Sequence, residues 1–388
     1  MSELVINISN IISPLCYSLF RIEPFTTCSF NCIYCYARWY REDDSVKPRF
    51  RALNEFRVVA RKLNERKLRT IPFRLSTLSD PFQPLESKVK IVRNILKIAL
   101  EYEIPLIINT KSNLIMDDSI KKLILKLGSK NLVLIQISIS TLNNNISSKL
   151  EPKASPPYER LKIIENLSKE NIPVAVRLQP YIPGISDYPN LEDTIRSIKD
   201  IGALHLIVES IRLPKRDIIE LENILHLKLD LWEPYQVTIP SSLEDVALYR
   251  LSYNIRHRIF RELANLARRY NLFFATCKEG FFHLHSSPDC CGIFLLSGEK
   301  CIVRPTLNEV YVLVKKYGTL TLDEVISRLK DLDVLFDEKL KPYPKRLKKP
   351  LRNHEKKFIR VLRNSKILHH ITPSLTYHDG KVVLRSSF

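Results

Sequence analysis

The sequence has no apolar run long enough to cross a membrane, and its first residues lack the pattern of a signal peptide. Glycine and methionine are scarce, with 8 and 2 of 388 residues, whereas isoleucine, leucine and lysine are common. These features argue against an integral membrane protein and favour a globular cytoplasmic protein. A chain of this length can bury a large core and is expected to form more than one domain.

Acidic residues are the minority among the charged ones. The 61 Lys and Arg face 42 Asp and Glu, which gives a formal net charge of +19 and a pI near 9.5. This excess favours a polyanionic partner, and nucleic acid is the first candidate. The alternative is a lysine-rich surface of the thermophilic kind. Such surfaces usually balance lysine with glutamate, which this sequence does not, so the two interpretations are compatible.

The cysteines are the most informative residues. Eight of them in a chain of this size suggest metal binding in a reducing compartment rather than a disulfide framework. Cys28, Cys32 and Cys35 form a C-x3-C-x2-C run, with Tyr34 just before the last. Three thiolates are one short of a closed four-iron cluster or structural zinc site. The spacing therefore predicts a metal centre with one open position. A zinc knuckle, for which Cys16 is the upstream candidate as fourth ligand, is the alternative.

This cysteine run resembles the cluster loop of the radical S-adenosylmethionine (SAM) superfamily. More narrowly, the chain resembles the group related to spore photoproduct lyase, often described as DNA-repair-photolyase-like. It departs from the family at Thr27, where a glycine is usual, and it lacks a glycine-rich segment after the second strand, so Ser76–Asp80 would take that place. The matching motifs are Glu-Pro-Phe-Thr-Thr-Cys-Ser-Phe-Asn-Cys-Ile-Tyr-Cys-Tyr-Ala at 23–37, Ser-Asp-Pro-Phe-Gln-Pro-Leu-Glu at 79–86, Thr-Lys-Ser at 110–112, Ile-Ser-Thr-Leu at 139–142, Lys-Leu-Glu-Pro-Lys-Ala at 149–154 and Pro-Tyr-Ile-Pro-Gly-Ile-Ser-Asp at 180–187.

The resemblance implies a catalytic centre at the three cysteines. Cys28, Cys32 and Cys35 would bind a 4Fe-4S cluster, and SAM would chelate the iron that lacks a thiolate. The reduced cluster would then cleave SAM and yield a 5′-deoxyadenosyl radical. The cofactors supply this chemistry, while the protein supplies position and shielding. A reductase or a ferredoxin-type protein would be the electron donor.

Apolar runs alternate with amphipathic helical patterns, which indicates βαβ units and a parallel sheet. Six such units fit the partial (β/α)6 barrel that the resemblance implies, with the active site in the loops after the strands. The expected strands are Arg21–Phe25, Phe73–Thr77, Leu106–Thr110, Val133–Ser140, Val174–Gln179 and Leu204–Ser210. The expected helices are Leu53–Arg66, Val89–Glu101, Ser119–Leu127, Pro157–Lys169 and Leu191–Ile201.

Polar side chains near the ends of these strands are the expected cofactor ligands. Ser76 and Asp80 are placed to meet the amino group of the methionine moiety, although an ordinary Asp-Pro turn also explains Asp80. Lys111 could pair with the cofactor carboxylate, or it could be an exposed lysine at the start of a helix. The complete expected set is Tyr34, Ser76, Asp80, Lys111, Ser140 and Arg177.

Three of these residues carry further alternatives. Tyr34 would present backbone groups to the adenine, but it could equally be a core aromatic residue. Ser138 and Ser140 could reach the ribose, although small strand residues are common without such a role. Arg177 lies within an apolar strand, where a buried guanidinium needs a partner. A cofactor carboxylate or ribose would satisfy it, and Glu151 is the chief protein alternative.

A second group of cysteines follows the predicted barrel. Asn254–Tyr270 is an amphipathic helix, and the short apolar run Leu272–Thr276 leads into that group. The group could bind a second iron-sulfur cluster or zinc, with Gly292 supplying a bend after the adjacent pair. Otherwise the thiols are small apolar core residues, or one of them donates a hydrogen atom to a substrate radical. The cysteines concerned are Cys277, Cys290, Cys291 and Cys301.

The tail has the pattern of a winged helix. It contains helical segments at Leu307–Lys316, Thr321–Lys330 and Glu355–Asn364, with a Pro- and Lys-rich stretch at Lys341–Pro350 and a terminal hairpin around an Asp-Gly turn. Winged helices bind duplexes or dock proteins. The expected domains are therefore an N-terminal segment at 1–20, the barrel at 21–240, an extension with the second cysteine group at 241–304 and a winged-helix-like basic domain at 305–388.

These features together predict a radical SAM enzyme that acts on nucleic acid, with DNA lesion repair as the first suggestion of the resemblance. An RNA- or tRNA-modifying radical SAM enzyme is one alternative. A non-catalytic, metal-stabilised nucleic-acid-binding protein is the other. The open three-cysteine loop after a strand, together with six βα units, argues against the non-catalytic protein.

Overall fold

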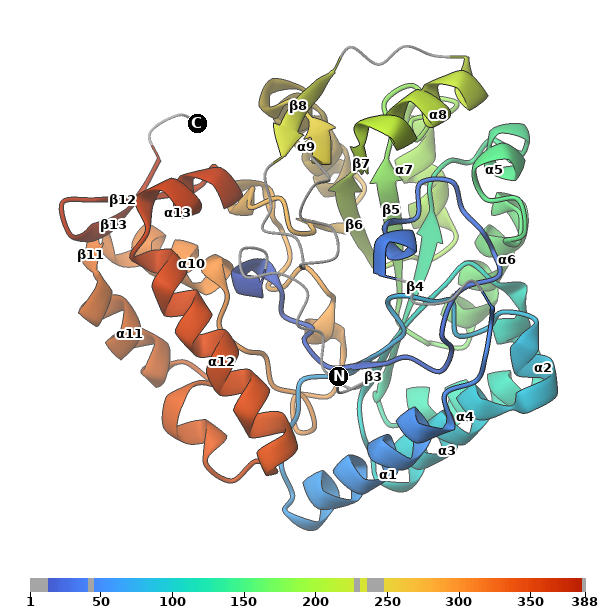
Figure 1. Cartoon of the computed structure of the whole chain (residues 1–388), viewed down its shortest axis with the longest axis horizontal. Helices are drawn as coiled ribbons and strands as arrows, with labels where there is room; N and C mark the ends of the chain where they lie inside the picture. The colour runs from blue at the N-terminus through green and yellow to red at the C-terminus, as the bar shows by residue number, and fades with distance from the viewer. Residues whose placement is uncertain (1–12, 41–44, 227–230, 236–247, 386–388) are drawn as a thin grey trace.

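The main element of the structure is a seven-stranded parallel sheet with the order β1-β2-β3-β4-β5-β6-β10 (Figure 1). The computed structural model describes residues 13–40, 45–226, 231–235 and 248–385. A parallel sheet that curves between flanking helices confirms the predicted α/β partial barrel. The strands are β1 (Arg21–Ile22), β2 (Phe73–Leu75), β3 (Leu106–Thr110), β4 (Val133–Ile139), β5 (Val174–Tyr181), β6 (His205–Ser210) and β10 (Phe273–Thr276).

The seventh strand, β10, was not predicted as part of the sheet. It pairs in parallel with β6 through Phe273 with His205 and Thr276 with Val208. It follows the predicted amphipathic helix α9 (Tyr253–Arg269). The main sheet therefore continues beyond residue 240, into the segment predicted as an extension.

The outer helices cover one face of this sheet. The longer ones are α1 (Phe50–Glu65), α3 (Ile91–Glu101), α4 (Asp118–Gly128), α6 (Pro157–Lys169), α7 (Leu191–Asp200) and α9, and the shorter ones are α2 (Leu85–Val89) and α5 (Asn144–Leu150). A further helix, α8 (Lys215–Leu225), follows the sixth strand of the sheet and a short connecting strand. Within the described ranges, no helix combines the length and the apolar character needed to span a bilayer.

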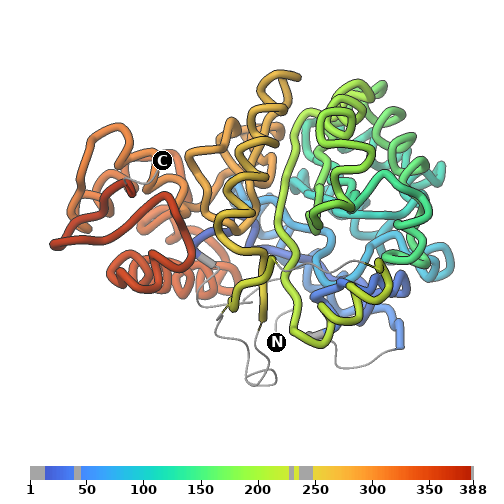
Figure 2. The backbone as a smooth tube through the Cα atoms, turned by 90° about the horizontal axis from the view of Figure 1, so that it is seen from above, coloured from blue at the N-terminus to red at the C-terminus, as the bar shows by residue number. Residues whose placement is uncertain are grey.

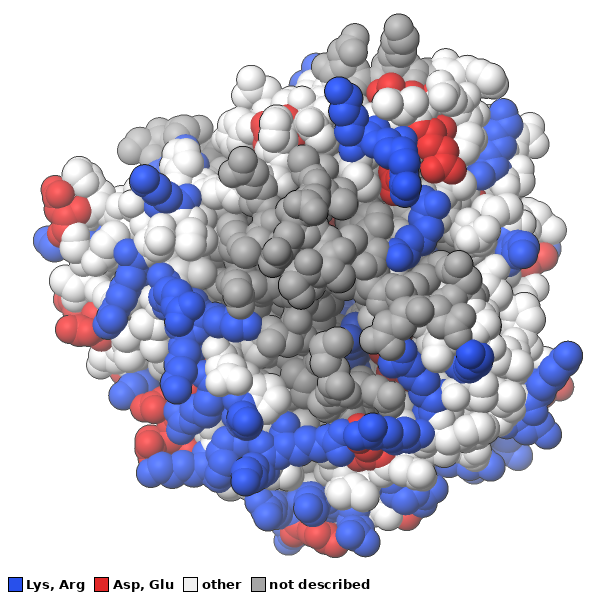
Figure 3. All heavy atoms as spheres, in the orientation of Figure 1, with Lys and Arg blue, Asp and Glu red and all other residues white. Residues whose placement is uncertain are grey.

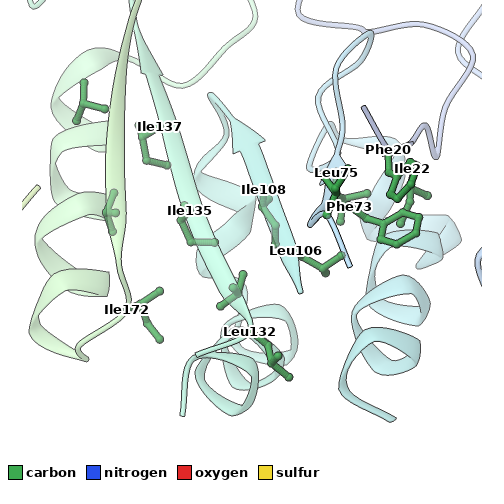
Figure 4. Close-up of a cluster of buried hydrophobic side chains, with 14 of the residues drawn as sticks. Phe20, Ile22, Phe73, Leu75, Leu106, Ile108, Leu132, Ile135, Ile137 and Ile172 are labelled. Atoms are coloured by element: carbon green, nitrogen blue, oxygen red, sulfur yellow. The ribbon is translucent and has the colours of Figure 1, made fainter. Parts of the chain in front are cut away.

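Side chains alternate between the two faces of each strand, and this alternation places the site. Leu106, Ile108, Ile135 and Ile137 belong to the large core shared with the outer helices, where Phe20 and Phe73 also stack at 5.1 Å between ring centroids (Figure 4). The intervening residues face the opposite side of the sheet. They begin as apolar residues and become polar toward the strand ends, which concentrates polar groups at the carboxyl end of the sheet. The apolar residues are Ile107, Leu134, Ala175 and Ile207, and the polar ones are Asn109, Gln136, Ser138, Arg177 and Gln179.

A small antiparallel sheet adjoins the carboxyl end of the main sheet. It has the order β7-β9-β8, made of β7 (Arg212–Pro214), β9 (Leu248–Leu251) and β8 (Trp232–Tyr235). Its β7 follows β6 directly, so it lies at the same end as the polar strand residues.

The tail has the arrangement expected for a winged-helix-like domain. A capping box at Thr321 and Glu324 begins its second helix, as the sequence predicted. Its three-stranded sheet has the order β11-β13-β12. The elements are α10 (Leu307–Tyr317), β11 (Leu320–Thr321), α11 (Leu322–Asp331), α12 (Lys345–Leu362), α13 (Ser365–Ile371), β12 (Leu375–His378) and β13 (Lys381–Leu384).

Helix α12 is longer than predicted. It starts at Lys345, so the second half of the Pro- and Lys-rich stretch is helical although Pro350 lies inside the helix. Burial outweighs the hydrogen bond lost at the proline, because Leu347 and Leu351 pack into the core of the barrel. Phe358 belongs instead to the core of the tail. One helix thus joins the two cores, and the tail lies directly beside the barrel (Figure 2).

Candidate active site

A cavity of about 330 Å³ opens at the carboxyl end of the main sheet. Its volume falls within the roughly 300–1,000 Å³ that is usual for small-molecule sites. Both the predicted cysteine loop and the polar strand ends line it. Of the predicted site residues, the cavity is lined by Cys28, Cys32, Cys35, Tyr34, Ser76, Asp80, Lys111 and Arg177.

Ser140 is the exception among the predicted residues. It is fully buried behind the wall of the cavity, and its Oγ donates a hydrogen bond to Glu151 Oε1 at 2.6 Å. Ser138, two residues earlier on the same face of β4, lines the cavity instead. The structure therefore places Ser140 behind the wall of the cavity, with its side chain turned toward the carboxylate of Glu151.

The cysteine loop is clamped on both sides of Cys28. Gln83 is fully buried, and its Oε1 accepts a hydrogen bond from the Ser29 backbone N–H at 2.9 Å. Its Nε2 donates to the Thr27 carbonyl at 3.0 Å. Further along, the Ile33 N–H donates to the Leu150 carbonyl at 3.0 Å. These contacts hold the loop against the segments after β2 and α5, with its thiols toward the cavity.

The three thiols suit a multi-iron cluster better than a single metal ion. Burial raises the pKa of Cys28 to about 12 and raises the pKa of Cys32 further, so thiolates here need positive charge close by. No three His, Cys, Asp or Glu side chains of the described ranges converge as a single ion would require. In a four-iron cluster each cysteine binds a different iron, so such convergence is unnecessary. Cys16, the candidate fourth ligand of a zinc knuckle, lines the same cavity, and its Sγ donates to the Ser18 carbonyl at 3.4 Å.

A buried charge network lies next to this loop and is centred on Glu151. Its Oε1 accepts from Lys111 Nζ at 2.7 Å and also from the Tyr34 hydroxyl, while Arg160 forms a close ion pair with Oε2. Burial alone would raise the pKa of Glu151, but Arg160 and Lys111 outweigh it and hold this pKa well below its usual range. Glu151 therefore remains ionised and fixes the side chains of both Tyr34 and Lys111.

Asp80 forms the turn that the sequence offered as its alternative role. Its Oδ1 accepts from the Phe82 N–H at 2.9 Å, and its Oδ2 accepts from the Lys111 N–H at 2.7 Å. The Ser76 hydroxyl likewise donates to the Ser79 carbonyl. Both side chains line the cavity while holding the loops after β2 and β3 in place.

Arg177 has protein partners other than Glu151, the alternative that the sequence offered. Its guanidinium donates to Gln136 Oε1 at 3.0 Å and to Gln179, and it contacts Cys277 Sγ at 3.7 Å. Glu151 pairs with Arg160 instead, so the alternative partner that the sequence offered for Arg177 is not the one it contacts. Arg177 lies on the inner face of β5, whereas Arg160 belongs to α6, one of the outer helices.

The sequence comparisons agree with the chemistry of this cavity. Residues 22–198 match the family model of the radical SAM superfamily. This part of the chain is a radical SAM domain. The domain implies a 4Fe-4S cluster and SAM as cofactors.

Two curated relatives share part of the sequence. The uncharacterized protein ORF301 of Acidianus two-tailed virus is 28% identical over 172 residues, which are 42% of this chain and 52% of that protein. The uncharacterized protein MJ0683 of Methanocaldococcus jannaschii is 27% identical over 175 residues, which are 43% of this chain and 61% of that protein. The chain thus spans less than two thirds of either relative.

Solved structures of spore photoproduct lyase share the fold. The enzyme complexed with dinucleoside spore photoproduct superposes with a TM-score of 0.52 at 14% identity, over 68% of this chain and 79% of that chain. A variant with bound AdoMet and dinucleoside spore photoproduct gives a TM-score of 0.51 at 14% identity, over 66% and 76% of the two chains. The likeness extends beyond residue 198, because it covers more of the chain than the radical SAM family match does.

Three cysteines of the second group line the cavity, and the fourth does not. Cys277, Cys290 and Cys291 line the cavity, and the last two sulfurs lie 4.0 Å apart. Arg74 donates to Cys291 Sγ at 3.4 Å, and a hydrogen bond from Cys290 together with Arg177 holds the pKa of Cys277 well below its usual range. The described residues contain no group suited to a second metal ion, so the expectation of a zinc ion here has no support.

Cys301 and Gly292 complete this group. Cys301 does not line the cavity, and burial raises its pKa to about 12. Gly292 adopts φ +79°, and a Cβ at this position would meet Leu134 Cδ2 at 2.9 Å. The predicted bend after the adjacent cysteines is thus confirmed, and it directs them into the interior of the barrel.

Sequence reasoning missed one residue that lines the cavity, Lys278, and two that support its loops, Glu23 and Gln83. Lys278 lines it directly after β10, and Glu209 raises the pKa of this lysine although burial would lower it. Glu23 holds the loop after β2 by accepting from the Thr77 N–H at 2.8 Å. The signal for Lys278 was its place after an apolar run, and the signals for Glu23 and Gln83 were their places within the resembling motifs.

The clamp on the cysteine loop gives a first prediction. Gln83→Leu keeps the size of the side chain but removes both hydrogen bonds to Thr27 and Ser29, leaving two buried backbone groups unpaired at a cost of roughly 1–3 kcal/mol each. We expect the variant to fold but to lose iron faster than the wild type during gel filtration with a chelator. Asn145→Leu, at an exposed position in α5, serves as the control. Equal iron retention in all three proteins would contradict a role for Gln83 in holding the loop.

Proposed function

We propose that this chain is a radical SAM enzyme that acts on a nucleic acid or a nucleotide-derived substrate, with a DNA lesion as the first candidate. The observation that carries the catalytic part is the single cavity shared by the three thiols of the cysteine loop and the polar strand ends. The net charge of +19 supports a polyanionic substrate. The shared fold with spore photoproduct lyase adds support, since one of those structures holds dinucleoside spore photoproduct.

The residues of the cavity would bind the cofactors and exclude water from them. Cys28, Cys32 and Cys35 would hold the 4Fe-4S cluster. When bound, the cluster and SAM supply one-electron cleavage of the sulfonium and thereby a 5′-deoxyadenosyl radical. A reductase or ferredoxin-type protein would deliver that electron.

The remaining residues would orient SAM. Tyr34 is held by Glu151 and Lys111, so its backbone is fixed next to Cys35 for contact with the adenine. Asp80 fixes the backbone of Lys111 at 2.7 Å, and Arg177 places positive charge on the wall of the cavity for an anionic group such as a carboxylate. Ser140 would act through Glu151 and not through direct contact.

Coupling between SAM cleavage and nucleic acid tests this proposal. Anaerobic, reduced protein should form 5′-deoxyadenosine slowly alone and at least several-fold faster with its substrate. The arms are ultraviolet-irradiated DNA, undamaged DNA and tRNA, each with product quantified by mass spectrometry. Stimulation by tRNA alone would favour the RNA-modifying alternative, and stimulation by none of the three would contradict action on nucleic acid. Iron-loaded protein that forms no 5′-deoxyadenosine would favour the non-catalytic alternative.

A further inference from the structure

Helix α12 carries a dense row of positive charge on its exposed face. Its 18 residues include eight Lys or Arg and one acid, Glu355, which is buried and paired with Arg352 at 3.1 Å. The buried face of the helix belongs to the two cores. Four exposed cations follow one another along the opposite face at spacings of 4, 7 and 4 residues, namely Lys345, Lys349, Lys356 and Arg360. We name this row the α12 stripe.

The α12 stripe is not neutralised by neighbouring carboxylates. Arg346 pairs closely with Glu55, and Arg352 pairs with Asp337 at 3.3 Å as well as with Glu355. These ion pairs neutralise Arg346 and Arg352, which are only partly exposed and lie beside the stripe. In the described part of the chain, the four cations of the stripe have no carboxylate within 4 Å. The space-filling view shows Lys and Arg gathered as a band over α12 and toward α1 (Figure 3).

A groove between α12 and α1 extends this surface. Its volume is about 460 Å³, and no carboxylate lines it. Two valines of α1, together with Pro344 just before α12 and Pro350 within it, contribute its apolar part. Its cationic side chains are Lys62, Lys345, Lys349 and Arg346, of which Arg346 is paired with Glu55. A concave surface with several cations and no acid suits phosphate groups, because each cation offsets part of the charge of a phosphodiester.

The groove is connected to the cysteine loop through α1. The Arg49 N–H, at the start of α1, donates to the Pro24 carbonyl just before the loop at 2.8 Å. At 1.5 Å per residue, Lys62 lies roughly 18 Å along the helix from its first residue. A partner on the α12 stripe would therefore lie beside the helix whose N-cap residue is hydrogen-bonded to the segment that leads into the cysteine loop.

We propose that the α12 stripe and the adjoining groove bind the phosphodiester backbone of a duplex nucleic acid. The inference rests on the proposed function and assigns its substrate a docking surface. At 1.5 Å per residue, the stripe from Lys345 to Arg360 is about 22 Å long, which matches several consecutive phosphates of one strand. The exposed face of α12 carries no aromatic side chain, so it offers no platform for stacking the bases of a single strand. Its contacts are with charge and not with base edges, so the surface positions the duplex without reading its sequence.

The test removes the four charges of the stripe without removing the helix. The variant K345Q/K349Q/K356Q/R360Q retains residues with good helix propensity. The matched control, K88Q/K97Q/K122Q/K126Q, removes the same charge from exposed positions on α2, α3 and α4. Binding of labelled duplex DNA, duplex RNA and single-stranded DNA of equal length is measured at several salt concentrations. Urea unfolding confirms that both variants are folded.

We expect the stripe variant to bind duplexes more weakly, with a log–log salt slope smaller by about 3 to 4, while the control changes it by less than about 1. SAM cleavage without nucleic acid should be unchanged, because the stripe lies away from the cavity. The DNA and RNA arms show which duplex binds more tightly.

The failure of this inference differs from the failure of the proposed function. The assignment to α12 would be overturned if wild-type protein binds nucleic acid but both quadruple variants lose the same amount of salt slope. A greater loss of affinity for single strands than for duplexes would also overturn it. Wild-type protein without salt-dependent binding to any of the three probes would overturn the nucleic-acid substrate itself.

Discussion

Replacing Cys28, Cys32 and Cys35 together by Ala removes the iron-sulfur chromophore from the protein. After anaerobic reconstitution, the wild type should be brown, with visible absorption that bleaches on reduction, because we propose that three thiolates of one loop bind the cluster. The triple variant should be nearly colourless and should lose almost all of the bound iron. Iron analysis and absorption spectroscopy of desalted protein measure both effects.

The other cysteines provide the control for this experiment. Cys301→Ala changes a buried thiol outside the cavity and should leave the iron content of the wild type. Cys277, Cys290 and Cys291 line the cavity, so iron that survives in the triple variant would point to them. Substantial iron in that variant would contradict a single centre at the cysteine loop, and full iron would remove the loop from cluster binding.

Glu151→Leu is expected to destabilise the fold by about 3–5 kcal/mol, since it leaves the buried guanidinium of Arg160 without its counter-charge. Both side chains are almost completely buried, at 0% and 1% exposure. The double variant Glu151→Leu/Arg160→Leu removes both charges and should recover much of that loss. Urea unfolding of cluster-free protein provides the comparison. A single variant within about 1 kcal/mol of the wild type would contradict the importance of this network.

The same pair makes a prediction about pH. The pKa of Glu151 is held well below its usual range in the folded protein, so its stabilising effect is complete above the unfolded pKa of about 4.5. That effect should be lost only as the pH falls through the depressed folded pKa. The difference in unfolding free energy between wild type and Glu151→Leu should therefore be constant from neutral pH to about pH 5 and shrink in stronger acid.

Most of the barrel could be predicted from the sequence because its central strands, β3 to β6, are apolar runs of five to eight residues separated by amphipathic helices. The strand β10 could not, because a run of only a few residues gains its identity from pairing with β6, some 65 residues earlier along the chain. The start of α12 was missed for a similar reason. Pro350 argues locally against a helix, and only the burial of Leu347 and Leu351 in the barrel core overrides it.

The candidate site shows the same limit. The spacing of Cys28, Cys32 and Cys35 identified the loop, since all three ligands lie within eight residues. Side chains at strand ends could be placed at the correct edge of the sheet, but their partners depend on tertiary contacts. Arg177 contacts Cys277 across the interior of the barrel, and Ser140 turns toward Glu151. Neither contact follows from periodicity along one strand.

Contacts between the tail and the barrel limit how the predicted domain boundary at residue 305 can be tested. Asn308 donates to the Tyr17 hydroxyl at 2.9 Å, and Arg69 pairs with Asp333 at 2.8 Å. Because α12 also belongs to both cores, removal of residues 307–388 would expose apolar surface of the barrel. The predicted domain boundaries remain a proposal, and point substitutions on the α12 stripe test nucleic-acid binding more cleanly than truncation does.

The most direct test of the central claim is the amount of 5′-deoxyadenosine formed from SAM by anaerobically reconstituted, reduced protein. We predict that the product accumulates with time in proportion to the amount of wild-type protein and is absent with the variant C28A/C32A/C35A. Mass spectrometry of the quenched mixtures measures it. Iron-loaded wild-type protein that forms no 5′-deoxyadenosine, or a triple variant that forms as much as the wild type, would contradict the claim that this cavity is a radical SAM active site.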